Sequence, residues 1–137
     1  MTWIWTTMVW CVASLCAQPS KCVEALPPFD STGHYFRAEL FEGETARLRL
    51  TLSSDHVYRF VVCSETGKPV LNLYDRSGVL ALSTKQTGKN YFDCHIRRRG
   101  KYTLTVTFER GEGMVAVVVG EAEKDAADQK GIIAESI

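Results

Sequence analysis

The residues best suited to chemistry lie in one short stretch, CHIRRRGKY, at positions 94–102. A thiol beside an imidazole supplies the two groups of a Cys/His nucleophile. Both residues fall within a strand pattern, however, and neighbours on a strand point to opposite faces of the sheet. Cys94 and His95 therefore cannot act together as nucleophile and base, and the run of three arginines that follows them is what remains for function.

The arginines are interpreted as part of a turn. YFDCHI (91–96) and KYTLTVTFE (101–109) both alternate apolar and polar residues, which predicts a β-hairpin whose tip is closed by Gly100 with a positive φ. A charged tip protects a strand from edge-to-edge aggregation. It can also hold an anion such as lipopolysaccharide phosphate, an acidic glycan or an acidic protein. The candidate binding residues at this basic tip are Arg97, Arg98, Arg99, Lys101, His95 and Tyr91.

No other sequence pattern points to catalysis. The remaining histidines, His34 and His56, lack the spacing of a metal site. The sequence contains no G-x-S-x-G, no phosphate-binding glycine loop and no H-E-x-x-H. DRSG at residues 75–78 lacks the string of acids that a calcium loop requires, and a turn accounts for it. We therefore predict no catalytic residue, no metal, no cofactor and no enzyme activity.

The overall charge excludes one class of partner. Sixteen basic residues balance 16 acidic ones, so no net charge would draw the chain onto nucleic acid. The charge is nevertheless uneven, since residues 85–101 are mostly basic and the tail from Glu121 is mostly acidic. Electrostatic binding is therefore expected from a local patch, with no nucleic acid among the partners.

The N-terminus has the character of an export signal. Residues 3–16 are apolar and uncharged, and they fall short of the roughly 20 residues that a membrane-spanning helix needs. We predict a signal peptide at residues 1–17, cut after Ala17, although the usual positive charge near Met1 is missing. The mature protein is then periplasmic or extracellular and has no stable membrane span.

Cysteine usage suggests one disulfide. Removal of residues 1–17 leaves Cys22, Cys63 and Cys94, among which three pairings can be drawn. Export favours a bridge, and we expect Cys63 to pair with Cys94 while Cys22 stays free. Strand alternation opposes this pairing, because Cys94 faces the core and Cys63 falls on the other face of its strand. A bulge near Val61–Val62 would be needed to bring the two thiols together.

Strand patterns recur between residues 34 and 120, separated by short polar turns and without amphipathic helical segments. One turn, at residues 75–78, suits a hairpin with Gly78 in the left-handed region. The apolar run at 114–120 is typical of a central strand buried on both faces. We predict an all-β, antiparallel β-sandwich of about seven or eight strands. A linker at 18–33 precedes it, and an acidic tail at 121–137 follows it as a disordered segment or a short helix.

Four segments carry a resemblance to known proteins: VYRFVVCSE, GKPVLNLYDRSGVL, RRRGKYTLTVTF and GMVAVVVG. Together they resemble small uncharacterised secreted proteins of Gram-negative bacteria, over about residues 40–120. The middle two are similar to the jelly-roll β-sandwich of pre-peptidase C-terminal (PPC) and GOLD domains, where an LYD-x-x-G hairpin precedes a G-x-Y strand. The resemblance implies an accessory or interaction module without catalysis of its own. Met114 stands where the secreted group would carry a cysteine, which leaves the partner of Cys63 open.

These observations lead to a hypothesis about function. We predict a secreted or periplasmic, non-catalytic module that binds a glycan or a protein. Its contacts would come from loop tips or from a strand face such as the row Thr103, Thr105 and Thr107. One alternative is a structural or assembly component of the cell envelope, and a weaker one is a hydrolase with a scattered site. The sequence makes no prediction of the ligand or of the oligomeric state.

Overall fold

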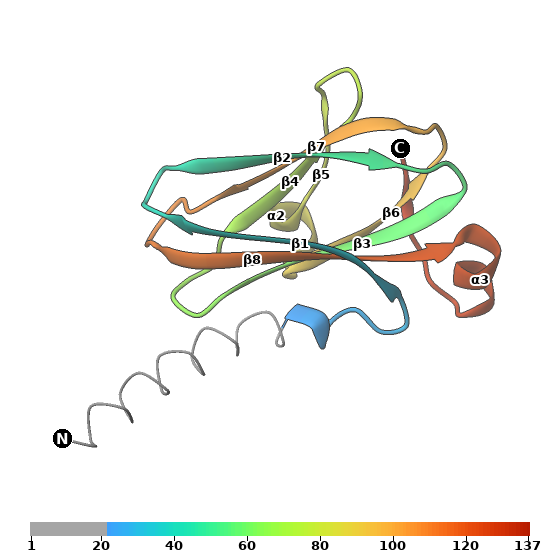
Figure 1. The fold of residues 1–137 in the computed structure, drawn as a ribbon, viewed down its shortest axis with the longest axis horizontal. Coiled ribbons are helices and arrows are strands. Elements are labelled where there is room, and N and C mark those ends of the chain that lie inside the picture. The colour runs from blue at the N-terminus through green and yellow to red at the C-terminus, as the bar shows by residue number, and fades with distance from the viewer. Residues whose placement is uncertain (1–21) are drawn as a thin grey trace.

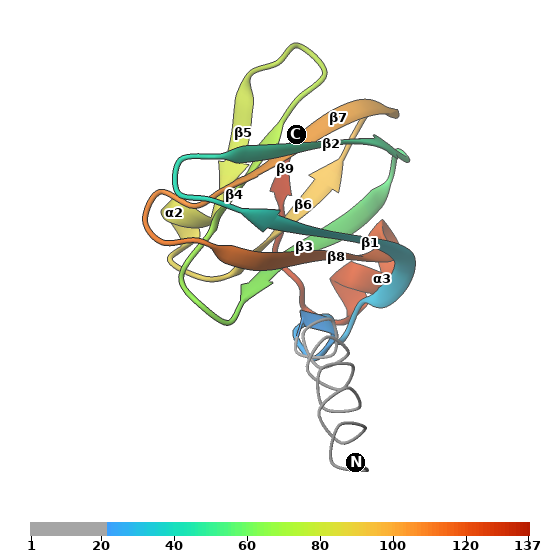
Figure 2. The same ribbon diagram turned by 60° about the vertical axis from the view of Figure 1, so that its left-hand side comes forward.

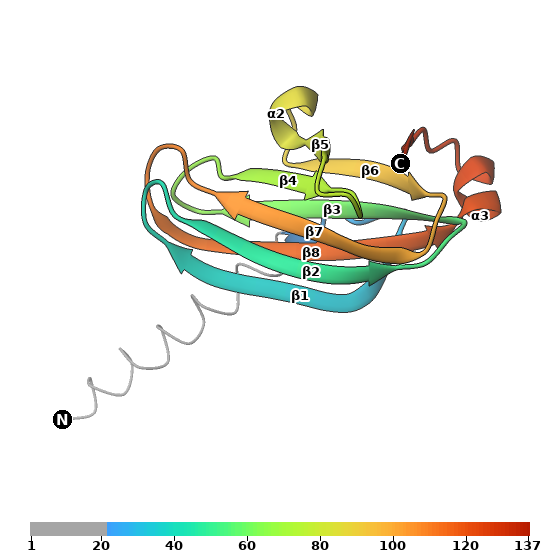
Figure 3. The ribbon, with the colours of Figure 1, turned by 90° about the horizontal axis from the view of Figure 1, so that it is seen from above.

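The structure is a computed structural model that describes residues 22–137. The predicted signal peptide at 1–17 lies outside the described residues. Two β-sheets pack face to face, with short helices at their margins (Figures 1 and 3). No helix in the described part of the chain is long and apolar enough to cross a membrane.

The larger sheet has five strands in the order β1-β8-β3-β6-β9. Its members are β1 (Asp30–Leu40), β8 (Gly113–Glu123), β3 (His56–Ser64), β6 (Tyr91–Ile96) and β9 (Glu135–Ser136). All neighbours run antiparallel except β9, which pairs in parallel with β6. Helix α3 (Lys124–Gln129) follows β8.

The smaller sheet has four antiparallel strands in the order β2-β7-β4-β5. Its members are β2 (Thr45–Leu52), β7 (Gly100–Thr107), β4 (Val70–Tyr74) and β5 (Leu80–Ser83), and the short helix α2 (Thr84–Thr87) follows β5. The predicted all-β, antiparallel sandwich is thus confirmed.

Alternating residues of the two sheets form the core. The inward residues of β7 pack against those of β3 and β8 across the sandwich, and they include Leu104, Phe60 and Val117, all nearly inaccessible to solvent. On the opposite side of β7, Thr105 is also buried, because it lies between Arg47 of β2 and Asn72 of β4. The proposed row of contact threonines is therefore interrupted at its centre.

Strand β8 is buried on both faces, as its apolar run predicted. Val115, Val117 and Val119 face the core between the sheets. Ala116 and Val118 face outward, where no third sheet lies over them. The N-terminal cover, which we define as residues 22–29, lies on this outer face instead (Figure 2).

The prediction of a linker at 18–33 does not match the part of it that is described. Leu26 and Phe29 of the N-terminal cover are 2% and 5% exposed, and β1 begins at Asp30. The cover begins with a helical turn, in which the amides of Ala25 and Leu26 donate to the carbonyls of Cys22 and Val23, and it packs onto the outer face of the large sheet. Gly120 of β8 permits this close approach, since a Cβ there would lie 2.9 Å from atoms of both Leu26 and Phe29.

The acidic tail is likewise packed against the domain. Strand β8 continues to Glu123, and Ala127 of α3 is buried against Phe29 and Val57. A short helix was one of the two predicted states for this segment. The small apolar contacts of Ala127 hold helix α3 in place. In the sequence, an alanine that makes such contacts looks the same as an alanine in a disordered tail.

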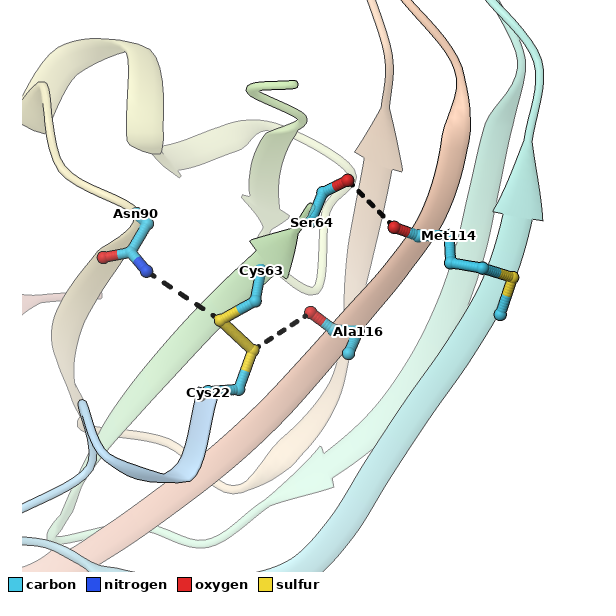
Figure 4. Close-up of a disulfide and its surroundings, with 6 residues drawn as sticks. All are labelled: Cys22, Cys63, Ser64, Asn90, Met114 and Ala116. Carbon is cyan, nitrogen blue, oxygen red and sulfur yellow. Dashed lines mark hydrogen bonds between the residues drawn. A yellow bond between two sulfur atoms is a disulfide. The ribbon is translucent and has the colours of Figure 1, made fainter. Parts of the chain in front are cut away.

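The predicted Cys63–Cys94 disulfide is wrong. Cys63 pairs with Cys22, with 5.7 Å between their Cα atoms (Figure 4). Cys94 is a free, buried cysteine. Strand alternation holds to the end of β3, so Cys63 faces outward toward the N-terminal cover while Cys94 faces the core. The Cys22 sulfur also lies 3.6 Å from the carbonyl oxygen of Ala116. The disulfide therefore fastens the cover to the centre of the large sheet.

Candidate functional site

The three consecutive arginines lie in a connection between the two sheets. Strand β6 belongs to the larger sheet and β7 to the smaller one, so residues 97–99 cross from one layer to the other. The predicted hairpin is therefore wrong here, and Gly100 has no left-handed φ. Gly100 is needed for a different reason, because a Cβ at this position would lie 2.4 Å from Cδ of Arg76.

Arg76 lies on the β4–β5 hairpin, which projects beyond the rest of the sandwich (Figures 1 and 2). The Asp75 carboxylate holds the hairpin tip by accepting hydrogen bonds from the backbone amides of Ser77 (2.8 Å) and Val79 (3.0 Å). Gly78 has φ 84°, so its predicted left-handed conformation is confirmed. The tip is thus an ordered turn that presents an exposed arginine.

The hairpin and the β6–β7 connection enclose a hollow of about 410 Å³ at one end of the sandwich. We call this region the arginine end. Tyr102 forms part of the wall, and its hydroxyl donates a 2.7 Å hydrogen bond to the carbonyl of Arg98. Burial raises the pKa of Tyr102, while the charges of Arg76 and Arg98 oppose this shift. The residues that line the hollow are Asp75, Arg76, Ser77, Arg97, Arg98, Tyr102 and Ile137.

The arginines of this end form no ion pair with an acidic side chain of the described residues. The ion pairs among the described residues join Arg59 to Asp93, Lys85 to Glu109 and Lys124 to Asp128. None of them involves an arginine of this end. The side chains of Arg76 and of residues 97–99 are exposed. Asp75, the acidic side chain among the residues that line the hollow, accepts two backbone hydrogen bonds. Such an arrangement favours an incoming anion.

The other candidate residues Tyr91, His95 and Lys101 do not line this hollow. The Tyr91 ring lies at the opposite end of β6, 4.3 Å from the guanidinium carbon of Arg59. His95 faces the tail, and its Nδ1 lies 3.2 Å from the Ser136 hydroxyl. Lys101 is exposed on β7 opposite Thr51 of β2. The hollow is thus lined by the predicted residues Arg97 and Arg98 together with Arg76, which the sequence did not indicate.

Two observations on the described residues concern the Cys94 thiol and metal binding. Cys94 is completely buried, and this burial raises the pKa of its thiol far above the usual range, so the reactive thiolate does not form at neutral pH. No group of three or more His, Cys, Asp or Glu residues between 22 and 137 could hold a metal ion. A second cavity, of about 580 Å³, lies at the other end of the sandwich beside Cys63, and its Lys85 is paired with Glu109.

Comparisons with known proteins bear on the fold. No family model matches the chain, and no curated protein gives a significant match. The chain is similar to a solved structure of Aeromonas hydrophila PliG, a periplasmic lysozyme inhibitor of g-type lysozyme. The TM-score is 0.56 at 11% sequence identity, and the match covers 69% of this chain and 89% of PliG. The two proteins share a fold. The resemblance to PPC and GOLD domains stays a prediction.

Proposed function

We propose that this chain is an exported, non-catalytic binding module whose partner is a protein, specifically a glycosidase of the lysozyme type. The observation that carries the proposal is the exposed arginine end, where Arg76 and residues 97–99 have no carboxylate partner within the described residues. The fold shared with a periplasmic lysozyme inhibitor supports the choice of partner.

The chemistry of such a partner complements the arginine end. Glycosidases cut their substrates with a pair of Asp or Glu side chains that flank the scissile bond. The cleft of such an enzyme therefore presents carboxyl groups, of which the base or nucleophile is ionised, and arginines bind carboxylates through two parallel hydrogen bonds. Opposite charge also speeds encounter between two proteins, more strongly at low salt. A ligand of this kind needs no catalytic group on the binding module.

Two features support an oxidising compartment outside the cytoplasm. The predicted signal peptide would direct the chain there, and the Cys22–Cys63 disulfide belongs to the class of bonds that persist in the periplasm or outside the cell. The proposed location is therefore the periplasm or the extracellular space. A lysozyme-type enzyme would be met in either place.

Binding of the full chain to a g-type lysozyme tests the proposal, with calorimetry for affinity and lysis of cell-wall suspensions for inhibition. We expect saturable binding and inhibition. Arg97→Ser with Arg98→Ser should weaken affinity at least tenfold, because both guanidinium groups are removed. Arg49→Ser with Arg47→Ser is the matched control, since these exposed arginines on β2 carry the same charge away from the arginine end.

Two results would contradict the proposal. One is the absence of binding to any lysozyme tested together with binding of peptidoglycan fragments, which would favour the glycan-binding alternative. The other is equal weakening by the two double variants, which would show that overall charge matters and the arginine end does not.

A further inference from the structure

We infer that the hollow at the arginine end is a carboxylate-binding site, in which Arg76, Arg97 and Arg98 hold an acidic side chain of the partner protein. This inference rests on the proposed function and names the contact that it would use. Arg76 is distant in sequence from Arg97 and Arg98, and the fold brings it to the same hollow. Three arginines from two loops line one hollow of about 410 Å³.

The charge of the hollow is available to a ligand. Asp75 is the acidic side chain among the lining residues, and its Oδ1 already accepts the amides of Ser77 and Val79. Neither Arg97 nor Arg98 forms an ion pair within residues 22–137. An incoming carboxylate would therefore not displace an internal salt bridge, so the cost of breaking one is avoided.

The hollow is ordered before a ligand arrives. The stem of Arg76 lies across Gly100, and its Nη1 donates a 3.4 Å hydrogen bond to the carbonyl of Arg99. Tyr102 is 3% exposed and fixes the carbonyl of Arg98 through its hydroxyl. Because these contacts already restrict the two loops, less conformational entropy is lost when a ligand binds.

The surroundings favour a carboxylate on a protein over a free inorganic anion. Val79 and Leu80, which follow Arg76 on the same hairpin, are 60% and 45% exposed. Exposed aliphatic side chains beside an arginine suit a peptide that offers both an acid and apolar contacts. A hollow of this volume is also much larger than a single small anion, and it can admit an acidic side chain with part of its backbone.

Nuclear magnetic resonance on the full chain tests the site directly. The probes are acetyl-Leu-Glu-Leu-Glu-amide, the same peptide with Gln in place of Glu, and inorganic phosphate. We expect the arginine Nε–Hε resonances of Arg76, Arg97 and Arg98 to shift with the Glu peptide and to stay in place with the Gln peptide. Arg76→Gln should lower the affinity for the Glu peptide at least fivefold, and Arg49→Gln should leave it unchanged.

The alternative outcomes overturn the inference. A shift with phosphate but none with the Glu peptide would identify a site for inorganic anions. Equal shifts with the Glu and Gln peptides would show that the site does not recognise the carboxylate. If Arg76→Gln fails to fold, Arg97→Gln must produce the same loss, and an unchanged affinity in that variant would also overturn the site.

The site and the proposed function can fail separately. Binding of the Glu peptide without binding of lysozyme would retain the carboxylate site and reject the lysozyme-type partner. Binding of lysozyme that is unaffected by Arg76→Gln, in a variant that melts at the same temperature as the unchanged chain, would retain the partner and reject the site.

Discussion

Arg59 on β3 and Arg97 in the β6–β7 connection carry the same side chain in opposite settings. The Arg59 guanidinium donates to both carboxylate oxygens of Asp93, at 2.7 and 2.9 Å. Its carbon lies 4.8 Å from the ring centroid of Phe29 and 4.3 Å from that of Tyr91. Arg97 is exposed and forms no ion pair within the described residues.

The difference between these two regions shows what decides the role of an arginine here. Arg59 faces Asp93 directly across the β3–β6 pair, and it also donates a 3.0 Å hydrogen bond to the carbonyl of Ala25. The pKa of Arg59 is raised, chiefly by its hydrogen bond to Asp93. Arg59 thus holds the N-terminal cover in place, whereas no arginine of the arginine end forms an ion pair within the described residues.

Removal of the disulfide should affect the N-terminal cover most strongly. The bond joins residues 41 apart, and a loop of that length corresponds to about 4 kcal/mol of stabilisation in the chain-entropy model. We therefore expect Cys22→Ser with Cys63→Ser to lower the free energy of unfolding by about this amount in denaturant titrations, while binding at the arginine end persists in the folded fraction.

Alkylation followed by peptide mass mapping provides the check on that prediction. The native protein should leave Cys94 unmodified, since it is buried, and unfolding without reduction should expose Cys94 alone among Cys22, Cys63 and Cys94. Modification of Cys63 before reduction would contradict the assigned disulfide.

Replacement of Arg59 should have the next largest effect. The side chains of Arg59 and Asp93 are 13% and 11% exposed, so Arg59→Met would leave a largely buried carboxylate without its partner, at a cost of about 3 kcal/mol. The double variant Arg59→Met with Asp93→Leu should recover part of that loss, because the uncompensated charge is gone. Thermal and denaturant unfolding measure both. An unchanged free energy of unfolding in Arg59→Met would contradict the role assigned to Arg59.

Two glycines offer a smaller and more selective comparison. Gly120→Ala places a Cβ 2.9 Å from atoms of the N-terminal cover, and such overpacking costs about 2 kcal/mol without altering the binding site. Gly100→Ala would instead displace the exposed Arg76, so we expect a stability change below about 1 kcal/mol and weaker binding of the Glu peptide. The same effect on binding from both variants would erase the distinction between the two regions.

The strands could be predicted from sequence because their pattern is local. The alternation of β7 and the apolar run of β8 each reflect burial on known faces of a sheet, and both strands form where the pattern indicates. The hairpin at residues 75–78 could also be predicted from sequence, because Asp75 and Gly78 are residues that favour a tight turn.

The N-terminal cover and the composite site depend on contacts between distant residues. Cys22, Leu26 and Phe29 are buried, but the three prolines among residues 18–33 favoured a linker in the sequence. The two thiols on β3 and β6 pointed to different faces, and that observation already opposed the pairing that was predicted. Arg76 meets Arg97 only because loops from different sheets converge, which requires the topology.

The route of the β6–β7 connection affects the width of the hollow at the arginine end. Arg76 is carried by the four-stranded sheet, while residues 97–99 leave the five-stranded one. The width of the hollow is therefore set by the distance between the layers, roughly 10 Å in packed sheets. Buried side chains at this end, such as Ile96 and Tyr102, lie in the core between the layers. A smaller residue at either position would alter the fit of a ligand while leaving every arginine in the sequence.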